Sequence, residues 1–294
     1  MKRFRTQGWK AGVAALFCAL LAGCSPVWLL NLAVPRAGYH VVRDIAYGPG
    51  QDQNPSRRLD LYVPDGLKAG APVLLFFYGG SWDSGSKDLY LAFGQAFTSQ
   101  GIIVAVADYR VFPETRYPGF VEDGAEALVW LRGHAAQYGG DEKRIFVSGH
   151  SAGAYNAMML AADGQYLRRA GGNISDICGV IGIAGPYDFL PLTDPKLIEI
   201  FGGANRAQTQ PITYIDGKRP PMLLAYDPDD TTVLARNSLN LAQKLRDFGS
   251  AATLRAYPGA GHIGLILSLA PEFRFRTSLR ADMGEFIQNT ACTS

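Results

Sequence analysis

A serine flanked by glycines is the pattern in this 294-residue chain with the clearest chemical meaning. Ser151 lies in Gly149-His150-Ser151-Ala152-Gly153, between an apolar run that ends at Ser148 and an alanine-rich stretch typical of a helix. This strand-turn-helix setting is that of a nucleophile elbow, in which the glycines allow a strained turn that exposes the serine hydroxyl. Because a serine hydroxyl is a weak nucleophile until a base takes its proton, the pattern predicts a histidine partner.

The chain contains four histidines, so the partner can be sought by elimination. His40 precedes the first predicted strand, His134 lies on a predicted helix, and the side chain of His150 should point away from its neighbour, the Ser151 hydroxyl. His262 remains, in a Gly-rich segment that follows the last predicted strand. We expect it in a flexible loop at the carboxyl edge of a sheet, where sites of α/β proteins are built. His262 is therefore the predicted base.

An imidazole base needs a carboxylate to fix its tautomer and to stabilise its charged form. The loop after the strand Met222–Tyr226 offers Asp227, Asp229 and Asp230. A calcium loop is the competing interpretation of this acidic cluster, but Thr232 stands at the sixth position, where such a loop needs glycine. The order serine, aspartate, histidine along the chain matches that of α/β-hydrolases.

Short apolar runs alternate with helical patterns along the rest of the chain. Continuous apolar runs are typical of buried parallel strands, whose two faces are both covered by helices. The pattern therefore predicts one α/β domain with a mostly parallel eight-stranded sheet and helices on both faces, the first two strands forming an antiparallel edge. The predicted strands are 41–47, 59–63, 73–78, 102–107, 145–148, 180–184, 222–226 and 253–257, and the predicted helices 89–100, 120–138, 152–162, 233–248 and 272–289.

From about Tyr39 to Asn289 the chain resembles the α/β-hydrolase fold, in the esterase branch of hormone-sensitive-lipase-like carboxylesterases, feruloyl-esterase-like proteins and kynurenine formamidases. These relatives carry H-G-G-x-W after the third strand, where this chain has Tyr78-Gly79-Gly80-Ser81-Trp82, and Asp-Tyr-Arg after the next strand, as at 108–110. Their acid precedes a valine by three residues, which selects Asp230 through Val233, with Asp229 as the fallback.

The resemblance also implies an oxyanion hole, made of the backbone amides of Gly79 and Gly80 and, after the nucleophile, of Ala152. Tyr78 stands where the relatives carry a histidine that braces this loop. The replacement bears on the geometry of the loop more than on the reaction itself. Asp108, Arg110 and Asp123 are expected to hold loops by ion pairing rather than to contact substrate. Aromatic residues near the carboxyl ends of the strands are candidates for the pocket wall, although each could equally belong to the core: Trp82, Tyr155, Tyr187 and Phe189.

These residues predict hydrolysis of short to medium carboxylic esters through an acyl-enzyme, with no metal or cofactor. The segment 186–220 is long enough for a small lid. Two alternatives stay open at this point: an amide hydrolase or acyltransferase that uses the same residues, and a binding protein on a hydrolase scaffold. With 28 basic and 26 acidic residues, and hence a net charge of +2, the chain has no excess charge to favour binding to nucleic acid.

The first residues are typical of an export signal, because four basic residues are followed by the apolar run 11–22. Leu21-Ala22-Gly23-Cys24 resembles the lipobox of bacterial lipoproteins, which implies cleavage after residue 23 and a lipid on Cys24. The expected organisation is a signal peptide (1–23), a tether (24–38) and a catalytic domain (39–294) on the periplasmic side of the outer membrane. An uncleaved membrane anchor is the alternative. Cys178 and Cys292 would then meet oxidising conditions, and the sequence leaves open whether they bond.

Overall fold

The computed structural model describes residue 31, residues 34–50 and residues 53–292. The predicted signal peptide (1–23) and the predicted lipidation site Cys24 lie outside these residues. A single mixed sheet forms the centre of the described chain, with the strand order β1-β2-β4-β3-β5-β6-β7-β8. Its strands are β1 (Tyr39–Ala46), β2 (Arg58–Pro64), β3 (Ala71–Phe77), β4 (Ile103–Ala107), β5 (Gly140–His150), β6 (Gly179–Ile183), β7 (Met222–Tyr226) and β8 (Ala252–Ala256).

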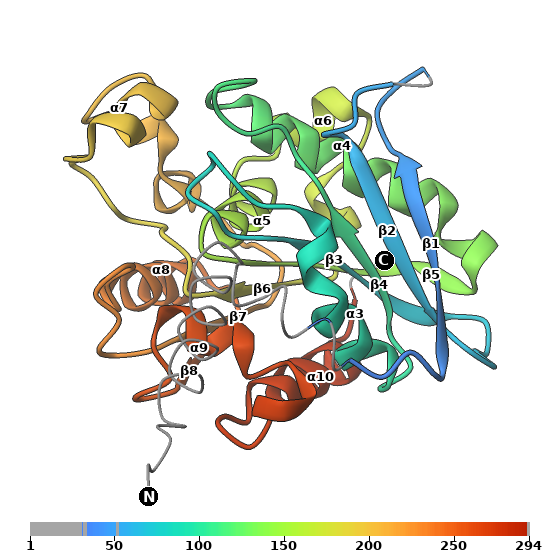
Figure 1. The fold of residues 1–294 in the computed structure, drawn as a ribbon. Coiled ribbons are helices and arrows are strands. Elements are labelled where there is room, and N and C mark those ends of the chain that lie inside the picture. The colour runs from blue at the N-terminus through green and yellow to red at the C-terminus, as the bar shows by residue number, and fades with distance from the viewer. Residues whose placement is uncertain (1–30, 32–33, 51–52, 293–294) are drawn as a thin grey trace, which may run out of the picture.

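Helices cover both faces of this sheet, as the sequence predicted (Figure 1). On one face α4 (Gly119–His134), α5 (Ala152–Ala162) and α8 (Arg236–Asp247) pack on the central and late strands. On the other face lie α3 (Leu91–Thr98), which contacts β2 and β4, and α10 (Leu279–Asn289), which contacts α3 and β7. The parallel strands β3, β4 and β6 are buried along their whole length, since both of their faces are covered. No helix among the described residues is both long and apolar enough to cross a bilayer.

The predicted eight strands are all confirmed, and β1 and β2 do form the antiparallel edge, because β2 also pairs antiparallel with β4. Short helices were missed: α6 (Gln165–Ala170), α7 (Pro195–Phe201) and α9 (His262–Leu267). Each is only six or seven residues long, too short for a 3.6-residue apolar repeat to stand out. The predicted helix 233–248 begins later, at Arg236, because residues 230–235 belong to the loop between β7 and α8. This loop, residues 227–235, is called the acid loop below because it carries Asp230.

A disulfide joins Cys178 to Cys292, which settles the question that the sequence left open. Cys178 immediately precedes β6, and its N–H donates to the Ile145 carbonyl of β5 at 2.7 Å, so the sheet itself holds this end of the bond. Cys292 follows α10. The disulfide therefore fastens the segment after α10 to the amino-terminal ends of two central strands.

Loss of this disulfide should lower the free energy of unfolding by about 2–5 kcal/mol, because the bond closes a loop across a separation of 114 residues and so restricts the unfolded chain. The measurement is urea unfolding followed by circular dichroism, with and without a reducing agent. The double variant Cys178→Ser/Cys292→Ser is the control and should not respond to the reductant. Equal midpoints for oxidised and reduced wild type would contradict the expectation.

Candidate active site

Ser151 occupies the tight turn between β5 and α5, with φ 54° and ψ −121°. A non-glycine residue adopts positive φ only where its surroundings enforce it. Here they do. A Cβ at Gly149 would lie 2.2 Å from the Gly153 carbonyl, and a Cβ at Gly153 would lie 2.1 Å from the Phe77 carbonyl oxygen of β3. Only glycine fits at these two positions, so α5 can approach the sheet closely enough to bend the chain at Ser151.

The structure brings the three predicted catalytic residues into one hydrogen-bonded row. The Ser151 Oγ lies 2.9 Å from Nε2 of His262, and Nδ1 of His262 lies 2.7 Å from Oδ2 of Asp230. A carboxylate can only accept, so the proton of the neutral imidazole is on Nδ1, and Nε2 is left to accept the serine proton. The side chain of Asp230 is 2% exposed and that of His262 is 10% exposed, so water competes little for either contact.

Asp230, rather than the fallback Asp229, is the carboxylate that reaches the histidine. Its second oxygen, Oδ1, accepts from the N–H groups of Thr232 and Val233 at 2.8 and 3.0 Å, which fixes the carboxylate plane. Asp229 is exposed, and the only hydrogen bond recorded for it within the described chain is made by its backbone N–H.

Asp227 has a role that the sequence did not assign. Its carboxylate accepts from the N–H groups of Asp229 at 2.9 Å and Gly261 at 2.6 Å, and so ties the acid loop to the residue before His262. Burial alone would raise the pKa of Asp227, but the backbone amides that donate to the carboxylate outweigh it and lower the pKa. Both buried carboxylates are thus committed to protein donors. The described residues contain no cluster of three His, Cys, Asp or Glu side chains that could hold a metal ion.

The position of His262 corrects the sequence prediction of a flexible loop. His262 is the first residue of α9, and Gly261 before it has φ 72°. The backbone carbonyl of His262 lies 3.0 Å from Nε2 of His150. Because a carbonyl only accepts, Nε2 of His150 must be the donor. Burial, followed by the nearby His262 ring, lowers the pKa of His150 to about 3. His150 is therefore a neutral donor at working pH and adds no second positive charge beside the catalytic imidazole.

The loop between β3 and the short 3-10 helix η1 (Lys87–Tyr90), residues 79–86, is called the glycine loop. It lies directly against Ser151. A Cβ on Gly79 would stand 3.0 Å from the Ser151 Cβ, and one on Gly80, with φ 139°, would stand 2.2 Å from the Ser84 carbonyl oxygen. The turn closes on the carbonyl of Gly80, which accepts from Asp83 and Ser84. The Gly79 N–H faces the Tyr90 hydroxyl, whereas the Gly80 N–H has no acceptor among the described residues.

The predicted second arm of the oxyanion hole is the first residue of α5. The N–H of Ala152 belongs to the helical turn whose amides have no acceptor within the helix, and it lies at the positive end of the helix dipole. The arrangement fits an oxyanion hole whose free donors are the amides of Gly80 and Ala152, while the predicted Gly79 amide faces the Tyr90 hydroxyl.

Two cavities meet at Ser151. The first has a volume of about 390 Å³ and is lined by Trp82 and Ala152 together with residues of the α7 and α8 regions, among them Phe189, Leu197 and Leu234. The second has a volume of about 480 Å³, and its walls include Gly79, Gly80, His150, His262 and Ile263. Leu234 and Ile263 are each 48% exposed, so apolar side chains surround the entrance.

Of the four predicted aromatic pocket residues, Trp82 and Phe189 line a cavity beside Ser151. The indole Nε1 of Trp82 donates to Oδ1 of Asn156 at 3.0 Å, which orients the ring. The prediction was wrong for Tyr155 and Tyr187. Both side chains are completely buried: Tyr155 lies behind Trp82 and donates to the Thr209 carbonyl, and Tyr187 packs beneath Gly182 and Gly185. Their places on a helix and a loop near the strand ends do not reveal this second layer.

Leu197 of α7 is a wall residue that the sequence analysis missed, although a signal was present. Asp194 accepts from the N–H groups of Lys196 and Leu197, and Pro195 takes the first helical position. Asp followed by Pro is a recognised start of a helix. It would have placed a helix inside the segment 186–220, next to the serine.

Solved structures resemble this fold over nearly its whole length. A truncated carbohydrate esterase from gut microbiota superposes with a TM-score of 0.75 at 22% identity, covering 87% of this chain and 98% of that one. Esterase B from Lactobacillus rhamnosis, solved with an inhibitor, has a TM-score of 0.73 at 20% identity and covers 96% and 94%. At these identities the likeness establishes the fold, which is that of an α/β-hydrolase.

Curated relatives match at the level of sequence. A probable isoprenylcysteine alpha-carbonyl methylesterase of Arabidopsis thaliana is 31% identical over 275 residues, which cover 83% of this chain and 56% of the relative. Esterase LipC of Mycobacterium tuberculosis is 28% identical over 241 residues, which cover 75% and 59%. The chain thus spans less than two thirds of the length of these relatives.

Because Asp230 contacts His262 and Asp229 does not, substitution of these two neighbouring aspartates should affect catalysis differently. We expect Asp230→Asn to lower kcat on a p-nitrophenyl ester about 10³- to 10⁴-fold, since an amide at this position favours the wrong imidazole tautomer. Asp229→Asn changes the same charge one residue away and should keep activity close to wild type. Comparable losses in both variants, or a loss confined to Asp229→Asn, would contradict the assignment.

The BD-FAE family model matches residues 59–245, which run from β2 into α8 and include the glycine loop, the elbow and the acid loop. This match covers more than half of the chain. It includes Ser151 and Asp230, whereas His262 lies just beyond it, on the α9 helix that the fold places next to the elbow. The chain therefore belongs to the BD-FAE family.

Proposed function

We propose that this protein is a serine carboxylesterase that acts through an acyl-enzyme. The observation that carries the proposal is the hydrogen-bonded row Asp230–His262–Ser151, which ends beside the Gly80 and Ala152 amides, for which the described residues offer no acceptor. A row of this kind activates a hydroxyl, and amides so placed stabilise an oxygen that gains negative charge. Both are needed for attack on a carbonyl group.

The reaction follows from the positions of the protons. His262 accepts the hydroxyl proton through Nε2 while Ser151 Oγ bonds to the ester carbon, and the carbonyl oxygen takes up the charge near Gly79, Gly80 and Ala152. The tetrahedral intermediate collapses as His262 returns the proton to the leaving alcohol. Water then attacks the acyl carbon while His262 takes its proton. When the bond between the acyl carbon and Ser151 Oγ breaks, His262 returns this proton to Oγ, which releases the acid and restores the Ser151 hydroxyl.

The two cavities take different parts of the ester. His262 must protonate the leaving oxygen, and it lines the second cavity with Ile263, so the alcohol leaves on that side. The acyl group then occupies the first cavity, against Trp82, Phe189 and Leu197. A space of about 390 Å³ with aromatic and aliphatic walls suits a short to medium acyl chain.

The names of the relatives support ester hydrolysis without defining the substrate. The Arabidopsis relative is named for methyl esters of isoprenylcysteine and LipC only as an esterase. Both names share ester hydrolysis, and we assign this reaction alone to the chain.

We further propose that the protein is a lipid-anchored enzyme of a bacterial cell envelope, with Cys24 as the lipidated residue. The lipobox-like Leu21-Ala22-Gly23-Cys24 supports this location. The Cys178–Cys292 disulfide supports it independently, because structural disulfides form in oxidising compartments such as the periplasm. The outer membrane is the proposed site, since no aspartate follows Cys24.

A series of p-nitrophenyl esters from acetate to long acyl chains tests the proposed reaction. The soluble fragment that begins at Ser25 should hydrolyse the short and medium esters, and Ser151→Ala should abolish this activity. Labelling of wild type, but not of Ser151→Ala, by a fluorophosphonate probe should accompany it. Activity that survives in Ser151→Ala would refute the mechanism, and turnover of amides but not of esters would move the assignment to an amide hydrolase.

The anchor has a separate test in a bacterial host. The full chain should fractionate with membranes and take up radiolabelled palmitate, whereas Cys24→Ala should take up none. Cys178→Ser is the matched control, because it removes a different thiol and leaves the lipidation site intact. Equal labelling of wild type and Cys24→Ala would contradict the proposal.

A further inference from the structure

The carboxylate of Asp108 contacts both ends of the glycine loop, here called the oxyanion loop because it carries the predicted oxyanion amides. The loop begins after Tyr78 and ends at Lys87, the first residue of the short 3-10 helix η1 (Lys87–Tyr90). The backbone N–H of Lys87 donates to Oδ1 of Asp108 at 2.8 Å. The Tyr78 hydroxyl also hydrogen-bonds the Asp108 carboxylate. Asp108 itself directly follows β4.

At its first end the loop is held by aromatic packing. The Tyr78 ring is buried and stacks on Tyr109 at 4.7 Å and on Tyr90 at 5.9 Å, and the Tyr109 hydroxyl donates to the Tyr78 carbonyl at 2.8 Å. A Cβ on Gly85, within the loop, would lie 2.4 Å from the same ring, so the loop folds directly over Tyr78. The tyrosine thus fills the place of the bracing histidine of the relatives with a side chain that reaches further.

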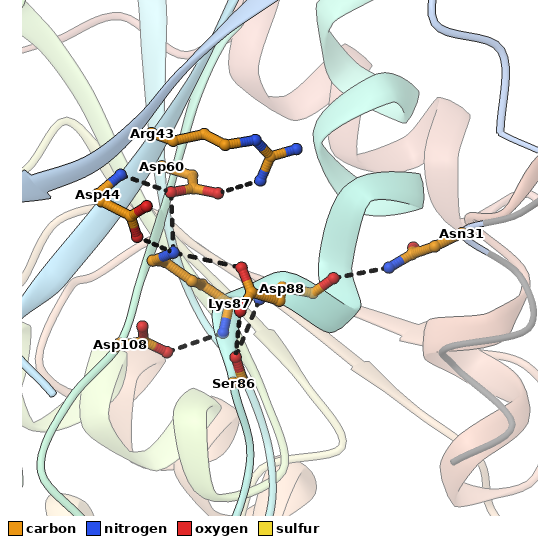
Figure 2. A network of polar contacts seen from close by, with 8 residues as sticks. All are labelled: Asn31, Arg43, Asp44, Asp60, Ser86, Lys87, Asp88 and Asp108. Carbon is orange, nitrogen blue, oxygen red and sulfur yellow. Dashed lines mark hydrogen bonds and ion pairs between the residues drawn. The ribbon is translucent and has the colours of Figure 1, made fainter. Parts of the chain in front are cut away.

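At its other end the loop is fixed by a buried ammonium group. Figure 2 shows Nζ of Lys87 among three carboxylates: those of Asp44 at 2.7 Å, Asp60 at 3.0 Å and Asp88 at 3.3 Å. The Lys87 side chain is only 4% exposed. Asp44 and Asp60 belong to β1 and β2, so this cluster fixes Lys87 to the antiparallel edge of the sheet. The backbone N–H of Lys87 is thereby held in place for Asp108.

Burial raises the pKa of Asp108 to about 6, although the Lys87 N–H, the Lys87 charge and the Tyr78 hydroxyl all act to lower it. Asp88 acts in the same direction as burial, and the Tyr47 and Tyr109 hydroxyls also interact electrostatically with Asp108. Above about pH 6 the two donors therefore meet a carboxylate, and below it they meet a neutral acid. Hydrogen bonds to an ionised acceptor are roughly twice as strong as those between neutral groups.

We propose that Asp108 is a positioning residue for the esterase reaction, and that its carboxylate sets the place of the Gly79 and Gly80 amides by joining Tyr78 and Lys87, the two ends of their loop. The inference rests on the proposed function. Asp108 touches no substrate. Its effect reaches the reaction only through the distance between the oxyanion and the two glycine amides.

The first test is Asp108→Asn, which keeps the size of the side chain and removes the charge. At pH 8 we expect kcat on p-nitrophenyl butyrate to fall about 10- to 100-fold with little change in KM, since a donor displaced by a fraction of an ångström stabilises the transition state less. The ratio of wild-type to variant kcat should shrink towards pH 5, where wild-type Asp108 is itself neutral.

The second test is Tyr78→Phe, which keeps the stacked ring and removes only the hydroxyl. It should lower kcat at pH 8 in the same direction, and the double variant with Asp108→Asn should be no slower than Asp108→Asn alone, because both changes open the same contact. Tyr47→Phe is the matched control. The Tyr47 hydroxyl donates to the backbone carbonyl of Asp108 at 2.7 Å rather than to its carboxylate, so its loss should leave kcat and the pH-dependent ratio unchanged.

The rate of Ser151 labelling by a fluorophosphonate separates this inference from the function on which it rests, because the phosphoryl oxygen uses the same amides whatever the natural ester. Slower labelling of Asp108→Asn than of wild type at pH 8 supports the inference. Equal labelling rates, or a kcat ratio that stays constant between pH 5 and pH 8, overturn it and leave the esterase proposal standing. A wild-type protein that neither hydrolyses esters nor reacts with the probe overturns both.

Discussion

The close approach of α5 to the end of β3 is the contact on which the site depends. Gly153 lies so near the Phe77 carbonyl that no side chain fits, and Gly149 lies equally near Gly153. With the backbone held from both sides, Ser151 has no alternative to positive φ. The strain at the serine is thus sustained by a buried sheet and a buried helix. The same contact places the Ala152 amide and, through Gly79, the oxyanion loop.

The surroundings of the serine assign a different protonation state to each ionisable group. Burial keeps His150 neutral, so that it only donates to the His262 carbonyl. Backbone amides hold Asp227 in its charged form and join the acid loop to Gly261. His262, between a carboxylate and a hydroxyl, is left as the imidazole of the row that can exchange its proton with the substrate. Because His150 and Asp227 already use their polar atoms in these hydrogen bonds, His262 is the group that accepts the proton from Ser151.

Features that depend on short-range pattern could be predicted from the sequence. The eight strands, the elbow and the order of Ser151, Asp230 and His262 follow from apolar runs, glycine spacing and a family motif. Asp230 could be preferred over Asp229 only through the position of Val233, since a choice between adjacent aspartates needs the direction of each side chain. The same limit explains Tyr155 and Tyr187. Packing in three dimensions decides whether an aromatic ring faces a cavity or the core behind it. In the sequence, both kinds of ring occur at the same places, near the carboxyl ends of strands.

The order of the elements along the chain has a consequence for how the enzyme is made. The nucleophile precedes its base by 111 residues, and both the acid and the base lie inside the loop closed by the disulfide, whereas Ser151 lies before it. A chain synthesised or exported from its amino terminus therefore exposes the elbow while the residues that activate it are still to come. Until β7, β8 and α9 have joined the sheet, Ser151 is an ordinary alcohol. Under the proposed function, an unfinished chain therefore has no hydrolytic activity until its last strands and α9 have folded.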